Sequence, residues 1–416
     1  MRQLFMLIPI LLFGCASKTS DNLTLSSIQI IDRNEISETI SNDQRLKLME
    51  QNDFFSPQPY KKVTRTYKKN TFGKTPGHVT TYHPNGQLYQ SLETLDGRAY
   101  GRYREYFPSG NLRLDACIIE GVGDTSKSAQ DDWLFDGLSR AWDDEGRLIA
   151  EIPYVKGYLD GLALYYMPNG KVHRSVPYSK GKQHGTTSIY DSEGQLIGSQ
   201  GFVEGLAHGR HHFIGNAFEP ANREQYEQGA LMEATYLDLD GRTVAQIRNG
   251  NGQKALFEKG KLRTTITYQS GLPEGDVQIF RPDGSLESKH ILIDGKKHGE
   301  EWLYFDTPDK PKMLITWYQD EIHGTVKTWY EDGSVQNERE MSHNKRHGHS
   351  FAWYLDGSLM LIENYTQGKL IKGSYLKRGV KEAISTVIDG NGTATLHDAN
   401  GVHLQSIIYK QGHPVE

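Results

Sequence analysis

The sequence contains 416 residues and carries a formal net charge of −5. This length allows more than one ordinary domain. The charge shows no basic excess, so we expect no nucleic-acid partner. Glycine is abundant, with 43 residues, and 23 tyrosines outnumber 14 phenylalanines. Such a composition suits a thin sheet with half-buried aromatic side chains better than a thick apolar core.

Residues 1–14 have the pattern of a signal peptide. One positive charge precedes an apolar run over residues 4–13, which is too short for an ordinary transmembrane helix. The motif LFGC, which ends at Cys15, is similar to the lipobox of bacterial lipoproteins. A plain secretory signal with an incidental cysteine is the alternative.

The lipobox resemblance implies how the protein is attached to the membrane. It implies cleavage before Cys15, transfer of diacylglycerol to its sulfur and acylation of the new amino terminus. Several acyl chains would anchor the protein stably. Because alanine and serine follow Cys15, with no aspartate, the resemblance further implies an outer-membrane lipoprotein that faces the periplasm or the cell surface.

Residues 15–72 are expected to form a polar tether between the anchor and the rest of the chain. The stretch 18–40 is rich in serine, threonine and asparagine. Residues 41–52 are compatible with a short helix capped by Ser41 or Asn42.

A repeat organises most of the remaining chain. The stretches 161–185 and 185–209 share one pattern with a period of 24 residues. Glycine opens each stretch, and an aromatic residue, a turn ending in glycine and an aliphatic residue follow. A second aromatic residue and a Gly-x-x-x-Gly closure complete the unit. A fixed period of this length is the signature of a repeat architecture.

Each repeat is predicted to be a β-hairpin. Strand-favouring residues flank pairs such as Asn169-Gly170, and an Asn-Gly pair between such runs is a strong hairpin signal. Because Pro168 cannot adopt the positive φ of a type I′ turn, we expect a type I turn, a left-handed glycine and a bulge. Burying three side chains stabilises a hairpin by only about 2–3 kcal/mol each, which is less than the conformational entropy cost of ordering its residues. A single hairpin is therefore unstable, and copies must stack edge to edge.

The repeats divide into two arrays. We predict a first array over 73–209, a degenerate repeat over 210–250, and a second array with a C-terminal cap over 251–416. An insert at 122–133 interrupts the second repeat.

The closures identify a family resemblance. The sequence YxxGKxHG at 178–185, and GKxHG at 295–299, together with a D/N-G-x-L hairpin, resembles the MORN repeat, specifically its bacterial variant. The resemblance implies an all-β fold of stacked hairpins in an elongated, curved single sheet, here in two sub-arrays. Some family members carry an antitoxin label, and eukaryotic relatives are usually assigned to protein or lipid contacts.

No residue pattern indicates an enzyme. The sequence has no nucleophile elbow, phosphate loop, HExxH motif or dinucleotide fingerprint, so we expect no catalytic residues, no cofactor and no bound metal. Histidines recur before the closing glycines, where a turn role is more plausible than a metal ladder because one histidine per repeat does not make a tetrahedral site. The local cluster His208, His211 and His212 is the only alternative metal candidate.

Aromatic residues are the candidate contacts for a partner. Trp142, Tyr166, Trp329 and Trp353 recur at repeat positions, where they either form an internal stacking column or line an exposed face. Trp133 lies outside the repeat pattern at the edge of the insert, and loops that interrupt a repeat often make contacts.

These observations favour a non-enzymatic, lipid-anchored scaffold of a Gram-negative envelope that binds a protein or polysaccharide. The membrane contact would be made through lipidated Cys15. An immunity or antitoxin protein, suggested by the family label alone, is one alternative. An envelope hydrolase centred on His208–His212 is another.

Overall fold

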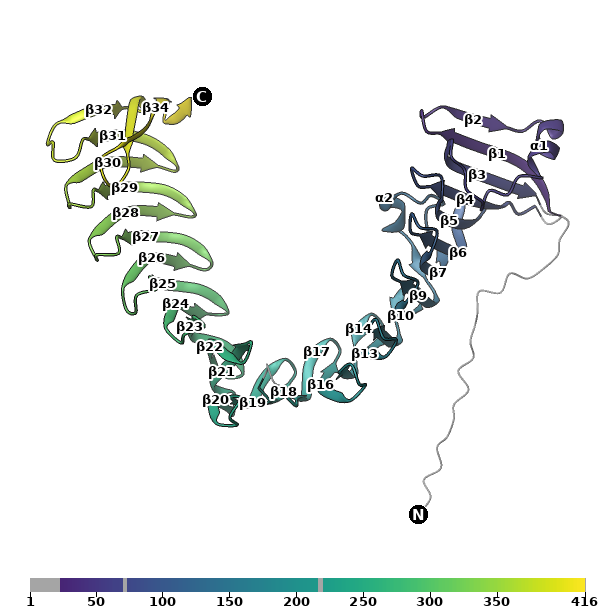
Figure 1. Ribbon diagram of the computed structural model, residues 1–416, viewed down its shortest axis with the longest axis horizontal. Helices are drawn as coiled ribbons and strands as arrows, with labels where there is room; N and C mark the ends of the chain where they lie inside the picture. Colours follow the sequence, from purple (N-terminus) through teal and green to yellow (C-terminus); the bar gives the residue numbers. More distant parts are fainter. Residues whose placement is uncertain (1–22, 70–72, 216–219, 416) are drawn as a thin grey trace, which may run out of the picture. The chain divides into compact units, whose positions relative to one another are not determined.

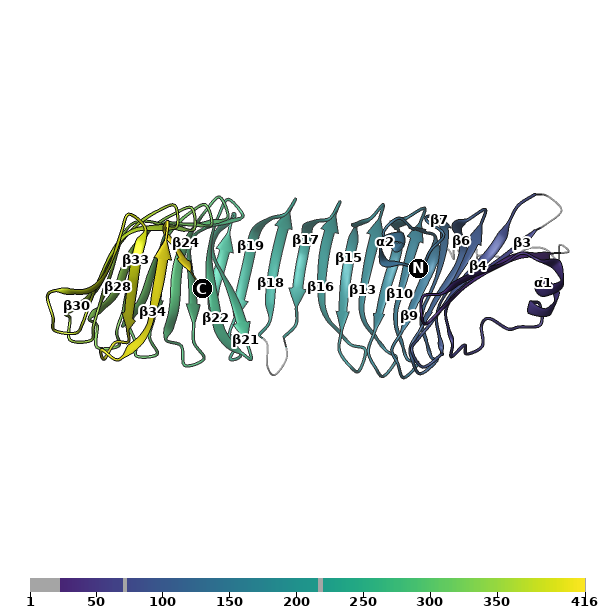
Figure 2. The ribbon, with the colours of Figure 1, turned by 90° about the horizontal axis from the view of Figure 1, so that it is seen from above.

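A computed structural model describes residues 23–69, 73–215 and 220–415. The chain divides into two compact units, unit 1 over Met1–Gly209 and unit 2 over Arg210–Glu416. Both units are built almost wholly of antiparallel β-hairpins, so the predicted all-β repeat fold is confirmed. Figures 1 and 2 show the hairpins of each unit side by side in an open sheet.

Unit 1 contains two short helices and the first strands. They are β1 (Thr24–Asp32), β2 (Ser37–Ile40), α1 (Asp43–Met49), β3 (Lys61–Lys69), β4 (Pro76–Tyr82), β5 (Leu88–Leu95), β6 (Arg98–Tyr106), β7 (Leu112–Glu120), α2 (Lys127–Gln130), β8 (Leu134–Phe135), β9 (Gly137–Trp142), β10 (Leu148–Val155), β11 (Tyr158–Leu159), β12 (Gly161–Tyr166), β13 (Val172–Ser179), β14 (Lys182–Gln183), β15 (Gly185–Tyr190) and β16 (Leu196–Val203). Strand β17 (Leu206–Phe213) crosses the boundary between the units. The paired strands run in the order β2-β1-β3-β4-β5-β6-β7-β9-β10-β12-β13-β15-β16.

Among its described residues, unit 2 contains only strands. They are β18 (Asn222–Glu227), β19 (Ala230–Leu237), β20 (Thr243–Arg248), β21 (Asn251–Glu258), β22 (Lys261–Gln269), β23 (Leu272–Phe280), β24 (Leu286–Ile293), β25 (Lys296–Tyr304), β26 (Pro311–Tyr318), β27 (Glu321–Trp329), β28 (Val335–Ser342), β29 (Lys345–Trp353), β30 (Leu359–Thr366), β31 (Lys369–Leu376), β32 (Ala383–Ile388), β33 (Asn391–His397), β34 (His403–Lys410) and β35 (His413–Val415). Each strand pairs with the next along the chain. The hairpin turns therefore lie along the edges of the sheet, as Figure 2 shows.

The predicted hairpin turn is present. Gly170 has a φ of +80°, and its N–H donates to the carbonyl of Met167 at 2.9 Å. The strand register shifts between Tyr165 and Tyr166, which is the expected bulge. The side chain of Asn169 donates to the carbonyl of Ser192 in the next repeat at 2.9 Å, so the turns are also joined from hairpin to hairpin.

Three Asp-Gly-Ser turns of unit 2 share a capping arrangement. The carboxylate of Asp356 accepts hydrogen bonds from the backbone N–H (2.9 Å) and hydroxyl (2.6 Å) of Ser358, and Asp283 and Asp332 hold their serines in the same way. These serine bonds lower the pKa of each aspartate, and Arg378 lowers that of Asp356 further.

We therefore expect unit 2 to become less stable in acid, because protonation of these aspartates weakens the hydrogen bonds in their turns. A carboxyl whose pKa is lower in the folded state stabilises the fold above its unfolded pKa, and that contribution is lost as the pH falls towards the folded pKa. The melting temperature should fall between pH 5 and pH 2, and less steeply in a D283N/D332N/D356N variant. Equal slopes for the variant and the parent would contradict this prediction.

The N-terminal segment departs from the sequence-based expectation. The predicted short helix is present as α1, and the side chain of its N-cap Asn42 accepts from the N–H groups of Gln44 and Arg45. The expected tether is wrong for residues 24–69, because β1, β2 and β3 extend the sheet of unit 1 and Leu46 of α1 packs with the fully buried Ile28. The polar serines and threonines alternate with apolar residues there, as in a strand with one buried side.

The predicted signal peptide and Cys15 lie outside the described residues. In the described part of the chain, no helix is long and apolar enough to cross a membrane.

Each unit has one packed face and one face that carries the hairpin aromatic residues. In β12, Ala163 is fully buried, whereas Tyr166 lies three residues further on and therefore points to the opposite side. In β27, Val326 is 1% exposed, and Trp329 lies on the opposite side for the same reason. We call the sides of Ala163 and Val326 the packed face of their unit, and the sides of Tyr166 and Trp329 the aromatic face.

Unit 2 contains two copies of one module, at residues 222–271 and 361–412. In the first copy, three turns meet through backbone hydrogen bonds: Leu231 N–H to Gly271 O, Gly271 N–H to Gly250 O, and Gly250 N–H to Met232 O, at 2.8–2.9 Å. The second copy repeats this triangle between Leu370, Gly412, Gly390 and Ile371 at 2.9–3.1 Å. Each copy surrounds one hydrophobic cluster of the unit.

Both modules bury a glutamate between two tyrosines. Glu224 accepts from the hydroxyls of Tyr226 (2.9 Å) and Tyr236 (2.5 Å), and Glu363 accepts from those of Tyr365 (3.2 Å) and Tyr375 (2.8 Å). The three residues have identical spacing in the two copies. Residues 222–250, which lie in the expected degenerate repeat over 210–250, form ordered strands of this module.

Candidate functional site

Four of the five predicted contact residues lie on the aromatic faces. Trp142 and Tyr166 are half-buried on the aromatic face of unit 1. Trp329 and Trp353 are half-buried on that of unit 2. The repeat pattern thus places each pair on one face of its own unit.

On the aromatic face of unit 1, one carboxylate accepts hydrogen bonds from two neighbouring strands. Glu151 accepts from the hydroxyl of Tyr166 at 2.7 Å and from Nε of Arg140 at 2.8 Å. Burial and the hydrogen bond to Glu151 raise the pKa of Tyr166 to about 12. Arg140 and Tyr166 in turn lower the pKa of Glu151. The ring of Tyr166 is therefore fixed in position, and its hydroxyl is already engaged.

In unit 2 the aromatic face carries a row of rings across three strands. Trp302 of β25 stacks on Trp329 of β27, with ring centroids 5.7 Å apart and planes 22° from parallel. On β29, the ring of Phe351 stacks between those of Trp353 and His349, and its centroid lies 5.9 Å from each of theirs. We call these five residues the aromatic row.

The row is bordered by charged side chains. Nζ of Lys327 lies 5.7 Å from the ring centroid of Trp329, within the range of a cation–π contact. The same ammonium pairs with Glu338 at 2.9 Å. A half-exposed aromatic surface with a polar margin has the composition of a recognition surface.

Trp302 and Phe351 were missed by the sequence analysis. Each lies two residues before the aromatic residue of its repeat, Tyr304 or Trp353. Because side chains two apart in a strand share a face, the spacings Trp302–Tyr304 and Phe351–Trp353 were the available signal.

Trp133 does not lie on a contact surface, so the prediction for it is wrong. Its side chain is 5% exposed and packs in the core of unit 1 with Tyr103, 4.8 Å away between ring centroids. Its indole N–H donates to the carbonyl of Val122 at 2.9 Å. The insert folds back on the sheet through α2, and Trp133 holds it there.

The structure places the candidate histidines of β17 on both sides of the strand. In β17, His208 and His212 lie on one side of the strand and His211 on the other, where its ring lies 4.5 Å from that of Tyr226. Nowhere in the described ranges do three or more His, Cys, Asp or Glu side chains converge to hold a metal ion. At the closures, Nδ1 of His347 accepts from the N–H of Gln367 at 3.3 Å, which is the expected turn role.

A hollow of about 280 Å³ lies beside Trp302 on the aromatic face of unit 2. The register pairs Gln278 with Lys289 and Lys289 with Trp302, so the three side chains lie on one face. Asp276, Ile291 and Glu300 also line it. The indole N–H of Trp302 donates to Glu300 Oε2 at 3.0 Å.

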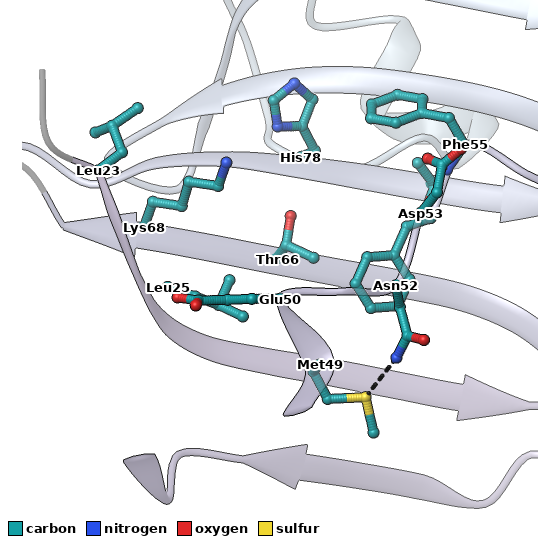
Figure 3. A pocket seen from close by; sticks show the side chains of 12 residues that line it. Leu23, Leu25, Met49, Glu50, Asn52, Asp53, Phe55, Thr66, Lys68 and His78 are labelled. Carbon is teal, nitrogen blue, oxygen red and sulfur yellow. Dashed lines mark hydrogen bonds between the residues drawn. The ribbon is translucent and has the colours of Figure 1, made fainter. Parts of the chain in front are cut away.

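A second pocket, of about 290 Å³, lies between the segment after α1 and strands β1, β3 and β4 (Figure 3). Its lining mixes apolar side chains, such as Leu25 and Met49, with charged ones, such as Glu50 and Lys68. The ring of Phe55 meets that of His78 edge to face at 5.6 Å. This mixture could hold a small amphiphilic molecule.

Comparison with known proteins identifies the repeat. Residues 76–95 and 322–343 match the family model described as MORN repeat variant. These two segments correspond to the β4–β5 and β27–β28 hairpins. The resemblance inferred from the closures is therefore confirmed for these repeats. No curated protein matches the chain.

Some solved structures show a remote similarity. A crystal structure of TcdB2-TccC3-TEV is 12% identical, with a TM-score of 0.16, and the match covers 88% of this chain and 24% of that one. The Photorhabdus luminescens Tc holotoxin pore is 12% identical over 94% of this chain and 18% of that one, with a TM-score of 0.15. A porin-like protein from Bacteroides uniformis is 11% identical over 67% and 93%, with a TM-score of 0.16. The chain spans about a quarter or less of the first two structures.

Proposed function

We propose that this chain, which carries MORN repeat variants, is a non-enzymatic scaffold of the cell envelope that binds a protein or glycan partner. Lipidation of Cys15 would hold it at the outer membrane. The aromatic faces of the two units would meet the partner.

The aromatic row of unit 2 is the observation that carries this proposal. Hydrophobic side chains on the packed face of this unit are largely buried, whereas the four larger rings of the row are half-buried and His349 is exposed. Large, ordered aromatic side chains with a polar margin supply most of the binding energy in many interfaces. The stacking of Trp302 on Trp329 orders the rings before binding, so little side-chain entropy is lost when a partner binds.

Removing two rings of the row should abolish partner capture. We expect the W329A/W353A variant to lose the partner that the parent protein recovers after cross-linking in envelopes, because each ring supplies contact area and stacking. Quantitative mass spectrometry of the recovered material measures this loss. I388A, which shortens an exposed side chain of the same unit, is the matched control. Equal recovery by the W329A/W353A variant would exclude the aromatic row as the contact surface.

The anchor is tested separately by replacing Cys15 with alanine. The parent protein is expected in the detergent phase, with an intact mass that begins at Cys15 and includes acyl chains. The C15A variant should lose these chains and leave the membrane fraction, because the acyl chains supply the membrane affinity. An unmodified, soluble parent protein would refute the envelope location.

A further inference from the structure

The hollow beside Trp302 contains polar groups that the protein itself leaves unused. The carboxylate of Asp276, the carboxamide of Gln278 and the ammonium of Lys289 make no hydrogen bond or ion pair with any residue in the described part of the chain. They come from adjacent strands, β23 and β24, and lie on the same face. The hollow therefore presents both donors and acceptors around one space.

The indole of Trp302 forms one wall of this space. Trp329 of β27 stacks on Trp302 from one side, whereas the hollow lies over β23 and β24, on the other side of β25. Glu300 accepts from the indole N–H at 3.0 Å and thereby holds the ring in its orientation. Ile291, which is 40% exposed, adds apolar surface at the edge.

We propose that this hollow binds one sugar unit of an uncharged glycan chain. The C–H face of a pyranose ring would stack on the indole of Trp302, and its hydroxyls would bond to Asp276, Gln278 and Lys289. The adjoining aromatic row would take the units that follow. This inference rests on the proposed function and narrows its partner to a carbohydrate.

The charges and polar groups of the hollow favour a sugar over the other occupants. Two carboxylates outnumber one ammonium, so an anionic ligand would be repelled. A purely apolar ligand would leave the carboxamide and the charged groups desolvated and unpaired, which is costly. A hydroxylated ring has one apolar face and can donate to the carboxylates and accept from the ammonium, so it satisfies both parts of the site.

The test measures binding of two uncharged oligosaccharides, maltohexaose and the hexamer of N-acetylglucosamine, to the full-length protein by titration calorimetry. At least one should bind. We expect W302A to weaken that binding about tenfold or more, and Q278A about twofold to tenfold, the effect of one hydrogen bond. W302F, which keeps an aromatic ring, should retain part of the affinity. I388A, which shortens an exposed side chain of the same unit, is the matched control and should bind as the parent does.

The outcomes separate this inference from the proposed function. If neither oligosaccharide binds at millimolar concentration, or if W302A binds as well as the parent, the sugar site is wrong. If, in addition, the W329A/W353A variant still loses an envelope protein that the parent captures, the scaffold function stands with a protein partner. Binding that is lost equally in I388A and W302A would also contradict the hollow as the site.

Discussion

Replacing Trp133 with alanine is expected to lower the free energy of unfolding of unit 1 by about 3–5 kcal/mol, the usual range for removing a large buried aromatic side chain. The indole packs against Tyr103, Phe135 and Ile118 in the main hydrophobic cluster of the unit. The substitution also leaves the carbonyl of Val122 without its donor. Denaturant unfolding of the full chain, followed by circular dichroism, measures the change.

Two further variants make this prediction specific. W133F keeps most of the ring but loses the N–H, so its effect should be clearly smaller. W142A removes a ring of the same type from the aromatic face, and its loss of stability should be about 1 kcal/mol or less. If W133A and W142A were equally destabilised, the insert would not be part of the core. Hydrogen exchange should also show residues 122–135 exposed in W133A, because the indole is what holds them on the sheet.

The hairpins were predictable because their determinants are local. Asn169 and Gly170 specify their own turn, whatever packs around it, and Pro168 excludes the competing turn type. The strand period of two then fixes which side chains share a face, so Trp142 and Tyr166 could be assigned to one face together. The family resemblance followed from the same local pattern.

The burial of Trp133 and the two modules of unit 2 were not predictable from local sequence patterns. Trp133 is buried because the insert folds back, and no periodicity within the insert signals that return. In the modules, Gly250 and Gly271 are joined by a hydrogen bond although a full hairpin separates them in the sequence. In the first module the turn glycines Gly229, Gly250 and Gly271 recur every 21 residues, so they do not follow the 24-residue pattern. For this reason residues 210–250, which include part of the first module, have the sequence pattern of a degenerate repeat.

The buried glutamates of these modules should stabilise unit 2 more than any of its surface ion pairs. Burial alone would disfavour ionisation of Glu224, but Lys254 at 2.8 Å and the two tyrosine hydroxyls hold the pKa of Glu224 below its usual range. Burial and the neighbouring carboxylate raise the pKa of Tyr236. The proton therefore stays on the tyrosine and the charge on the glutamate, which is the arrangement that the hydrogen bonds require.

We expect E363A to lower the free energy of unfolding of unit 2 by about 3–5 kcal/mol, because removing one member of a buried, hydrogen-bonded charge network leaves the others unpaired. In that variant Tyr375 and Tyr365 lose their acceptor, and Arg346, 3.5 Å from Glu363, loses its counter-ion. E224A should have a similar effect, since Glu224 holds the equivalent position of the first module. Denaturant unfolding measures the loss, and hydrogen exchange locates it around β30 and β31 for E363A and around β18 and β19 for E224A.

The matched control is E338A, which removes a glutamate of the same unit that also forms an ion pair. Glu338 pairs with Lys327 at 2.9 Å, but its side chain is 40% exposed, so the loss should be within about 1 kcal/mol. If E363A and E338A were equally mild, the carboxylate–tyrosine clusters would not stabilise the modules. Because the two modules flank the repeats from β23 to β29, opening either one should also deprotect the nearest repeat strands, as expected when a repeat array loses its cap. Exchange that remained confined to the mutated module would show that the array between them is stable without it.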